Sequence, residues 1–162
     1  MRRFALEDAA FVVEMVNDPD WIRHIGDRGV RTTEDAAAYI RDRIVTQYDK
    51  LGYGMYVVTL PDGVPIGSCG LIRRDSLEDV DIGFAFLARY RGLGYATEAA
   101  AAVLDYGIRG IGLPRIVAIV SPENHRSIRI LERIGMHFER MILLPGETEP
   151  IPLYAFEAPP AA

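Results

Sequence analysis

The spacing of hydrophobic residues predicts helices in the first third of the chain. Residues 6–16 carry four apolar side chains at helical spacing, Phe11, Val12, Met15 and Val16. The polar run 17–20 should end this helix, and residues 21–31 have no clear period, so we expect a long loop or short helical pieces there. A cap pattern at residues 32–35 predicts a second helix that continues to about residue 50.

From residue 53 onward the pattern changes to one typical of strands. Three alternating segments predict a meander of strands over residues 53–60, 64–74 and 79–87. The elements expected after them are a long helix that begins after Gly92, a buried strand at 115–120, a helix at 124–134, and two final strands near 136–144 and 151–157. With a strand at the start, the predicted order is β-α-α-β-β-β-α-β-α-β-β, a mixed α/β sheet with helices on its faces.

Length and composition favour one compact globular domain. The chain has 162 residues, of which 49% are hydrophobic and 25% charged. We expect a single domain over residues 1–157 and a Pro- and Ala-rich tail, residues 158–162, that frays. The paired final strands can close one sheet or serve a dimer, so monomer and homodimer both stay open.

Charge and cysteine content disfavour several functions. The formal net charge of −5 disfavours binding to nucleic acid, and no apolar run is long enough to span a membrane. Cys69, the one cysteine, lies in a predicted strand without a neighbouring His or acid, so we expect a small buried hydrophobe rather than a nucleophile. No Cys and His cluster has metal-ligand spacing, so no metal is expected. A reducing, cytoplasmic setting fits best.

The segment FLARYRGLGYATEAA carries the clearest chemical signal. It joins a predicted strand to a predicted helix, and Gly92 and Gly94 allow the backbone to turn tightly and approach a ligand. The N–H groups at the start of that helix form an anion site, to which Arg89 and Arg91 add positive charge. We therefore expect this turn to bind a diphosphate.

Four segments in fixed order resemble the GNAT superfamily of acyl-CoA-dependent N-acyltransferases, and most of all its RimJ/RimL-type branch of ribosomal-protein N-terminal acetyltransferases. They are LEDAAFVVEMVNDP, PIGSCGLI, DIGFAFLARYRGLGYATEA and NHRSIRILERIGMHFE. The resemblance implies a GNAT-like fold, with a mixed and mostly antiparallel sheet of about six or seven strands and about four flanking helices. It also implies acetyl-CoA as co-substrate and an amine as acceptor.

The resemblance further implies which residues bind the coenzyme. In the family, a Q/R-x-x-G-x-G/A loop wraps the CoA diphosphate with backbone amides. The end of the preceding strand pairs with the pantetheine arm, and the strand at 115–120 splays away to leave a gap for the thioester. The implied binding set is Phe86, Leu87, Arg89, Arg91, Gly92, Leu93, Gly94, Tyr95, Ala96, Asn124 and Ser127.

The implied chemistry is direct attack of a neutral amine on the thioester, so a base must take a proton from the amine. Asp81, on the strand that leads to the loop, is our first candidate. Glu78 and Asp79 are alternatives, and a solvated acidic turn is the competing interpretation of all three. A backbone N–H near Phe86 or Leu87 would polarise the thioester carbonyl.

The residue that would protonate the departing thiolate differs from the one found in many relatives. Many relatives carry a tyrosine acid in the helix at 124–134, but Leu131 occupies that position here. We expect Ser127 to hydrogen-bond the sulfur instead, and the competing interpretation is that Ser127 only helps cap its helix. The missing tyrosine also keeps open an alternative function, a non-catalytic CoA-binding or regulatory protein of the same fold.

The sequence leaves the acceptor open between a protein N-terminus and small-molecule amines such as antibiotics or polyamines. Asp18, Asp20 and Asp27 would attract a cationic acceptor, unless they are simply solvated. Trp21 and His24 are further candidate contacts with the acceptor. The competing interpretations are that Trp21 lies in the core or in a cleft wall and that His24 is an ordinary surface residue. A dinucleotide-dependent oxidoreductase is excluded, because the third glycine of its fingerprint is missing and a three-stranded meander precedes the loop.

Overall fold

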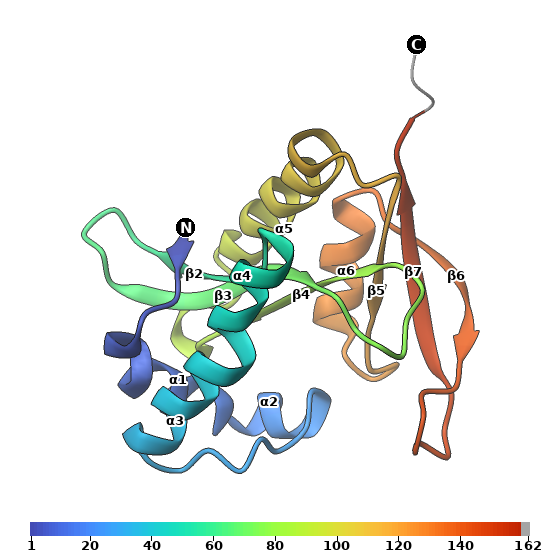
Figure 1. Cartoon of the computed structure of the whole chain (residues 1–162). Coiled ribbons are helices and arrows are strands. Elements are labelled where there is room, and N and C mark those ends of the chain that lie inside the picture. The colour runs from blue at the N-terminus through green and yellow to red at the C-terminus, as the bar shows by residue number, and fades with distance from the viewer. Residues whose placement is uncertain (160–162) are drawn as a thin grey trace.

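The structure is a computed structural model and describes residues 1–159. These residues form a seven-stranded sheet with helices on both faces (Figure 1). The strands are β1 (Arg2–Arg3), β2 (Met55–Thr59), β3 (Pro65–Ile72), β4 (Val80–Phe86), β5 (Arg115–Ile119), β6 (His137–Ile142) and β7 (Ile151–Glu157). The α-helices are α1 (Ala9–Val16), α2 (Pro19–His24), α3 (Thr33–Tyr39), α4 (Thr46–Leu51), α5 (Tyr95–Asp105) and α6 (His125–Arg133). The 3₁₀ turns are η1 (Leu6–Asp8) and η3 (Ala88–Tyr90), and the π-helical segments are η2 (Ile40–Val45) and η4 (Tyr106–Ile111).

The sheet is antiparallel except between its central strands, in the order β1-β2-β3-β4-β5-β7-β6. Strands β3 and β4 pair from Asp81 to Phe86, which is all of β4 except Val80. Strands β4 and β5 run parallel and pair only at Val80–Ile116 and Asp81–Val117. The rest of β4 therefore has no strand partner on its β5 side, and the expected mixed, mostly antiparallel sheet with its two separating strands is confirmed.

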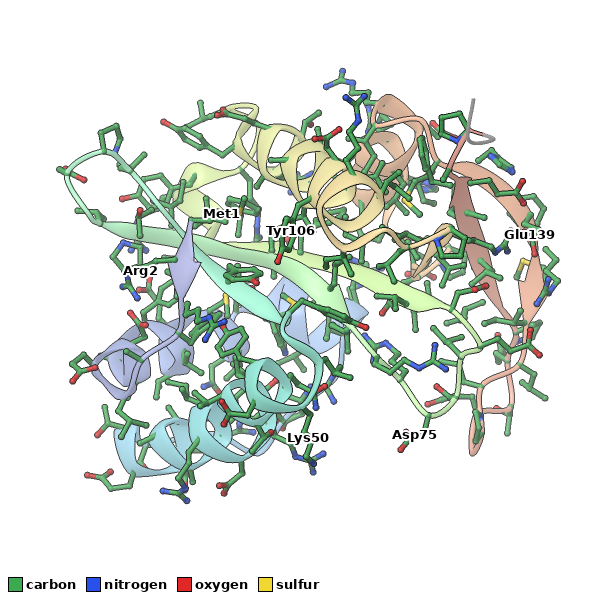
Figure 2. All side chains as sticks on the ribbon, turned by 45° about the horizontal axis from the view of Figure 1, so that its top comes forward. Met1, Arg2, Lys50, Asp75, Tyr106 and Glu139 are labelled. Carbon is green, nitrogen blue, oxygen red and sulfur yellow. The ribbon has the colours of Figure 1, made fainter. Side chains whose placement is uncertain are left out.

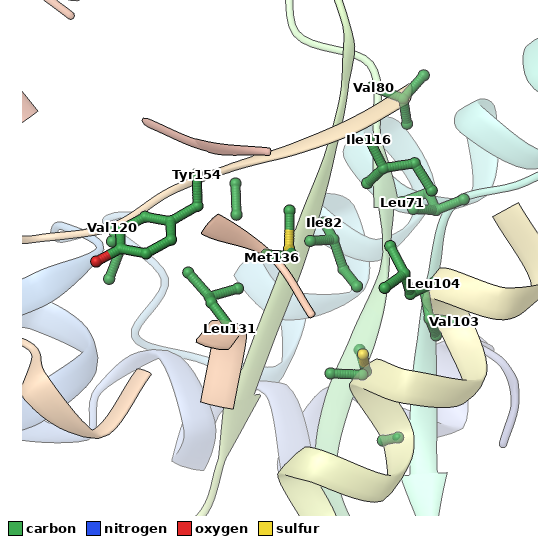
Figure 3. Close-up of a cluster of buried hydrophobic side chains, with 14 of the residues drawn as sticks. Leu71, Val80, Ile82, Val103, Leu104, Ile116, Val120, Leu131, Met136 and Tyr154 are labelled. Atoms are coloured by element: carbon green, nitrogen blue, oxygen red, sulfur yellow. The ribbon is translucent and has the colours of Figure 1, made fainter. Parts of the chain in front are cut away.

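Two hydrophobic cores lie on the two faces of this sheet. One packs α5 and α6 against the strands, and its members include Leu71, Ile82, Val103 and Leu131 (Figure 3). The other packs α1, α3, η2 and α4 against the opposite face. Because side chains alternate along a strand, neighbouring residues of β2 fall into different cores. The sheet is thus covered on both faces, and the gap between β4 and β5 is flanked by helices.

The first helix ends at Val16, before the polar run 17–20, as expected. One of the expected short helical pieces, α2, begins within that run at Pro19, because the Asp18 carboxylate accepts hydrogen bonds from the backbone N–H groups of Asp20 (2.9 Å) and Trp21 (3.4 Å). The helix expected to about residue 50 is present, but its middle is the π-helical segment η2. It ends at Gly52, whose φ of 78° suits the left-handed position after a helix.

The last strand, β7, ends at Glu157, as expected. The first residue of the predicted tail is still held by the fold, because the Ala158 N–H donates to the Pro114 carbonyl at 2.9 Å. Residues 160–162 lie outside the described residues, so most of the predicted tail does as well. Within residues 1–159, no helix has the length and apolar character needed to cross a bilayer.

Candidate active site

Two cavities meet where β4 separates from β5. The first, about 880 Å³, is lined by Asp81 and residues of η2 and α4, and we call it the Asp81 cavity. The second, about 890 Å³, is lined by Gly92, Gly94 and residues of α6, and we call it the loop cavity. Both are also lined by Phe84 and Ser127, so a molecule in one cavity can contact a molecule in the other.

The turn between η3 and α5 presents a set of available backbone N–H groups. Gly92 and Gly94 have φ values of 75° and 92°, a left-handed conformation that glycine adopts without strain. The N–H groups of residues 92–94 donate to no group among residues 1–159, and the first hydrogen bond of α5 runs from Glu98 N–H to the Gly94 carbonyl (3.1 Å). Residues 95–97 lie in the first helical turn, where N–H groups have no partner within the helix. The amides of residues 92–97 therefore remain free to bind an anion.

The two arginines expected beside these glycines are engaged within the protein. Arg91 forms ion pairs with Asp18 and Asp20, both at 2.7 Å, and its Nε donates to the Phe86 carbonyl at 2.8 Å. Arg89 pairs with Glu14 and lines neither cavity. The structure therefore does not bring Arg89 to the loop cavity, and the charge of Arg91 is largely compensated.

The acids that could have attracted a cationic acceptor also form ion pairs within the protein. Burial alone would raise the pKa of Asp18, but the Arg91 guanidinium beside it holds that pKa below its usual value. Asp20 shares the same arginine, and Asp27 pairs with Arg31 at 2.5 Å. Each of the three is ion-paired, although Asp18 and Asp20 share the single charge of Arg91.

Helix α6 supplies basic residues that the sequence analysis missed. Arg126, Arg129 and Arg133 all line the loop cavity. Their spacing of three and four residues puts them on one face of the helix, and this spacing was the signal available in the sequence. Arg126 lies 3.9 Å from Asp20, and the Arg129 Nε donates to the His125 carbonyl at 3.2 Å. Positive charge thus reaches the loop cavity from α6 rather than from Arg89.

Two backbone N–H groups at the end of β4, those of Phe86 and Leu87, were proposed to polarise the thioester carbonyl, and they point in different directions. The Leu87 N–H donates to the Ile66 carbonyl at 3.0 Å, so it is already used, and the Leu87 side chain is buried and lines neither cavity. Hydrogen bonds alternate between the two sides of an antiparallel strand, which turns the Phe86 N–H away from β3 and toward the gap. Phe86 also lines the loop cavity. Of the two, only Phe86 is placed for the expected role.

Asp81 is a buried acid, and one of its two carboxylate oxygens has no hydrogen-bond partner among residues 1–159. Its side chain is 2% exposed, and Oδ2 accepts a hydrogen bond from the Arg74 Nε at 2.5 Å. Oδ1 is buried and has no hydrogen-bond partner among residues 1–159, and the residue lines the Asp81 cavity. Burial raises the pKa of Asp81 to about 6, against the opposing effect of the Arg74 charge. At neutral pH the group is mainly a carboxylate that can still accept a proton.

The alternatives to Asp81 are placed elsewhere. Asp79 accepts a hydrogen bond from the Arg115 Nε at 2.9 Å, and neither Glu78 nor Asp79 lines a cavity. Cys69 is fully buried, and burial raises the pKa of its thiol to about 12, which keeps the thiol protonated and inert. In residues 1–159, no three His, Cys, Asp or Glu side chains lie close enough together to hold a metal ion.

At the start of α6, the capping residue is Asn124 and not Ser127. The Asn124 Oδ1 accepts a hydrogen bond from the Ser127 backbone N–H at 3.1 Å. The Ser127 side chain is half-buried and lines both cavities, whereas Leu131 is buried at 1% exposure. The Ser127 hydroxyl is therefore not needed to cap the helix.

Trp21 and His24 also face the place where the cavities meet. Both residues line both cavities. The Trp21 Nε1 and the His24 Nδ1 are buried without a hydrogen-bond partner among the described residues. Such atoms usually have a partner, so these two positions suit contacts with a bound molecule.

Comparison with known proteins agrees with this arrangement. The sequence model of the acetyltransferase (GNAT) domain family matches residues 1–137. YnaD, an uncharacterized N-acetyltransferase of Bacillus subtilis (strain 168), is 32% identical over 139 residues, 86% of this chain and 79% of YnaD. A GNAT-family acetyltransferase from Bacillus anthracis has a TM-score of 0.75 at 29% identity, with 95% of this chain and 90% of that chain covered.

A more distant structure shares the fold alone. The aminoglycoside acetyltransferase AAC(6')-Ib in complex with coenzyme A has a TM-score of 0.77 at 20% identity, with 96% of this chain and 92% of that chain covered. The family match and the YnaD similarity span most of the sequence described above. The chain therefore belongs to the GNAT family of acetyltransferases and is an acyltransferase.

Proposed function

We propose that the protein transfers an acetyl group from acetyl-CoA to the primary amine of a protein N-terminus or a small molecule. The observation that carries this proposal is the set of free amides at residues 92–97, which open on the loop cavity at the gap between β4 and β5. The fold shared with a coenzyme A complex supports the proposal.

The residues of the loop cavity suit a coenzyme with a diphosphate and an amide-bearing arm. The amides of residues 92–97 would bind the diphosphate, helped by the arginines of α6. The end of β4, beyond its pairing with β5, would pair with the arm at its open side. Acetyl-CoA bound there supplies an activated acyl group. Leu87 and Arg89 have no place in this arrangement.

The residues of the Asp81 cavity suit the acceptor. An alkylamine is almost fully protonated at neutral pH, so the base must remove a proton before attack. Asp81 takes this role through its open Oδ1, while Arg74 holds Oδ2 in place. The Phe86 N–H would polarise the acyl carbonyl. Because Phe86 lies five residues further along β4, about 16 Å from Asp81, the proton would reach Asp81 through a chain of water molecules.

Ser127 is the residue we assign to the departing sulfur. We predict that Ser127→Ala lowers kcat about 10²-fold, at the lower end of what one catalytic hydrogen bond contributes, and leaves the affinity for acetyl-CoA unchanged. Steady-state kinetics with calorimetric binding measures both. Ser76→Ala, in the exposed β3–β4 loop, is the control. Unchanged turnover in Ser127→Ala would remove the hydroxyl from the mechanism.

We extend the proposal to the RimJ/RimL-type branch, to a ribosomal or other protein N-terminus as one acceptor class, and to the cytoplasm. The LEDAAFVVEMVNDP and NHRSIRILERIGMHFE segments support the branch. A buried, unpaired Cys69 is compatible with a reducing compartment. Acetylation of peptides derived from ribosomal proteins is the direct test of the branch.

The function is tested by a thiol-release assay with acetyl-CoA and a panel of peptide and small-molecule amines. We expect thiol release that depends on the amine, together with an acetylated product by mass spectrometry. Binding of acetyl-CoA without release for any amine would favour the non-catalytic alternative. Absence of binding would overturn the proposal altogether.

A further inference from the structure

The lining of the Asp81 cavity is basic, although the whole chain carries a formal net charge of −5. The acids among its lining residues are Asp27, Asp75 and Asp81. The cationic residues are Arg28, Arg43, Lys50, Arg73 and Arg74. Because the composition favours acidic surfaces, a local excess of cations needs a local explanation.

Ion pairing inside the protein makes this excess larger. Arg74 compensates Asp81 at 2.5 Å, and Arg31, which does not line the cavity, compensates Asp27 at 2.5 Å. The other lining cations, Arg28, Arg43, Lys50 and Arg73, form no ion pair within residues 1–159. Of the three lining acids, Asp75 forms no ion pair within residues 1–159. The cavity keeps several uncompensated positive charges against one negative charge.

These cations come from separate parts of the fold and surround the opening of one cavity. Arg28 lies in the loop after α2, Arg43 in η2, Lys50 near the end of α4, and Arg73 directly after β3. Figure 2 shows Lys50 on its helix and Asp75 on the β3–β4 loop, two different walls of the cavity. All four cationic side chains are exposed, whereas Asp81 is buried.

The cations are not explained by the coenzyme. None of the four lines the loop cavity, where the free amides and the arginines of α6 already suit a diphosphate. Their position instead puts them around a molecule that reaches from solvent toward the open oxygen of Asp81. They therefore act on the acceptor.

We infer that the acceptor is an amine that also carries an anionic group, a carboxylate or a phosphate, at the end remote from the reacting nitrogen. This inference rests on the proposed acetyl transfer. The amine end would reach Asp81 while the anionic group lies among Arg28, Arg43, Lys50 and Arg73, where guanidinium groups bind carboxylate and phosphate oxygens in pairs. A polyamine would meet like charges at the same opening, so a cationic acceptor is disfavoured.

Matched acceptors test the inference directly. Dipeptide amides with one fixed N-terminal residue and aspartate, phosphoserine, asparagine or lysine at the second position keep the reacting amine constant. Aminobutyrate, which carries a carboxylate, and diaminobutane, which carries a second amine instead, give the same comparison of anionic and cationic acceptors without a peptide. We expect kcat/KM about tenfold higher for the anionic member of each pair, the scale of one or two favourable charge contacts. The aspartate and phosphoserine arms distinguish carboxylate from phosphate.

Charge-reversal variants at the opening of the Asp81 cavity are the second test of the inference. Arg43→Glu and Arg73→Glu should lower kcat/KM for the anionic acceptor about tenfold and leave that for the neutral acceptor and the KM for acetyl-CoA unchanged. Arg41→Glu is the matched control, since Arg41 is exposed, pairs with Asp42 and does not line the cavity. Turnover of lysine or diaminobutane acceptors equal to that of the anionic ones would overturn the inference while leaving acetyl transfer intact. An equal loss for neutral acceptors would overturn it too.

Discussion

At the scale of single residues, Asp81 has the environment that the proposed chemistry requires. It is buried and lines the cavity, one oxygen is held by Arg74, and the other has no hydrogen-bond partner among residues 1–159. Because the pKa of Asp81 is about 6, we predict that kcat at saturating acceptor falls as the pH drops below that value and the carboxylate becomes protonated. Asp81→Asn should lower kcat by about 10²- to 10³-fold and remove this acid limb from the pH profile.

The control for this prediction lies two residues away in the chain. Asp79→Asn should keep the acid limb, because Asp79 pairs with Arg115 and lines neither cavity. An acid limb that persists in Asp81→Asn would assign the titration to another group and would remove Asp81 as the base.

The same raised pKa predicts a pH-dependent stability. The folded protein binds a proton at Asp81 more tightly than the unfolded chain does, so the contribution of Asp81 to stability is greatest below about pH 4 and is lost as the pH rises through about 6. Asparagine resembles the protonated acid and still offers an oxygen to Arg74. Asp81→Asn should therefore be more stable than the natural protein at pH 7, by about 3 kcal/mol, with the difference vanishing near pH 4. Urea denaturation at both pH values measures it, and equal stability at pH 7 would contradict the placement of a charged carboxylate in an apolar setting.

Some site residues were predictable from local sequence and others were not. The turn at Gly92 and Gly94 follows from local backbone requirements, and the structure confirms their left-handed conformation. The pairing of Arg91 with Asp18 and of Arg89 with Glu14 joins residues more than 70 positions apart. No local pattern carries that information, so the expectation that both arginines face the ligand could not be checked without the fold.

At the scale of elements, α2 is the weakest part of the site. It has no buried residue, and Arg91 holds its first turn through Asp18 and Asp20. It nevertheless supplies Trp21 and His24 to both cavities. We predict that backbone amides of α2 exchange faster than those of α5, and that Arg91→Ala accelerates exchange in α2 about tenfold, because an ion-pair network that is partly buried is lost.

Hydrogen exchange followed by mass spectrometry measures this effect. Arg109→Ala removes an exposed arginine paired with Asp105 and is the control, for which we expect no change in α2. Slow exchange throughout α2 in Arg91→Ala would show that another contact holds the helix.

Periodicity predicted the type of most elements but not every detail inside them. The helix expected to about residue 50 is one continuous segment, yet η2 within it is π-helical. A π-helical segment shifts which side chains face the core without changing the overall apolar pattern, so periodicity alone does not predict it. Arg43, part of that segment, reaches the Asp81 cavity.

At the scale of the whole molecule, the account depends on a sheet that opens in its middle. Pairing of β4 with β5 stops after Asp81, and both cavities meet beyond that point. The resemblance implied this opening, but the charge around it depends on loops and helices from the whole chain. Only the fold shows that Asp18, Asp20 and Asp27 are ion-paired while the opening of the Asp81 cavity stays basic.

The affinity of acetyl-CoA for two matched glycine variants tests the central claim most directly. Gly94→Asp places a negative charge among the free amides, and Gly63→Asp imposes nearly the same backbone strain, φ of 92° against 91°, in a turn that lines neither cavity. By titration calorimetry we predict that Gly94→Asp weakens binding at least about tenfold, since one lost charge-assisted contact is of that order, while Gly63→Asp binds as the natural protein does. Undiminished binding by a folded Gly94→Asp protein would contradict the proposed site.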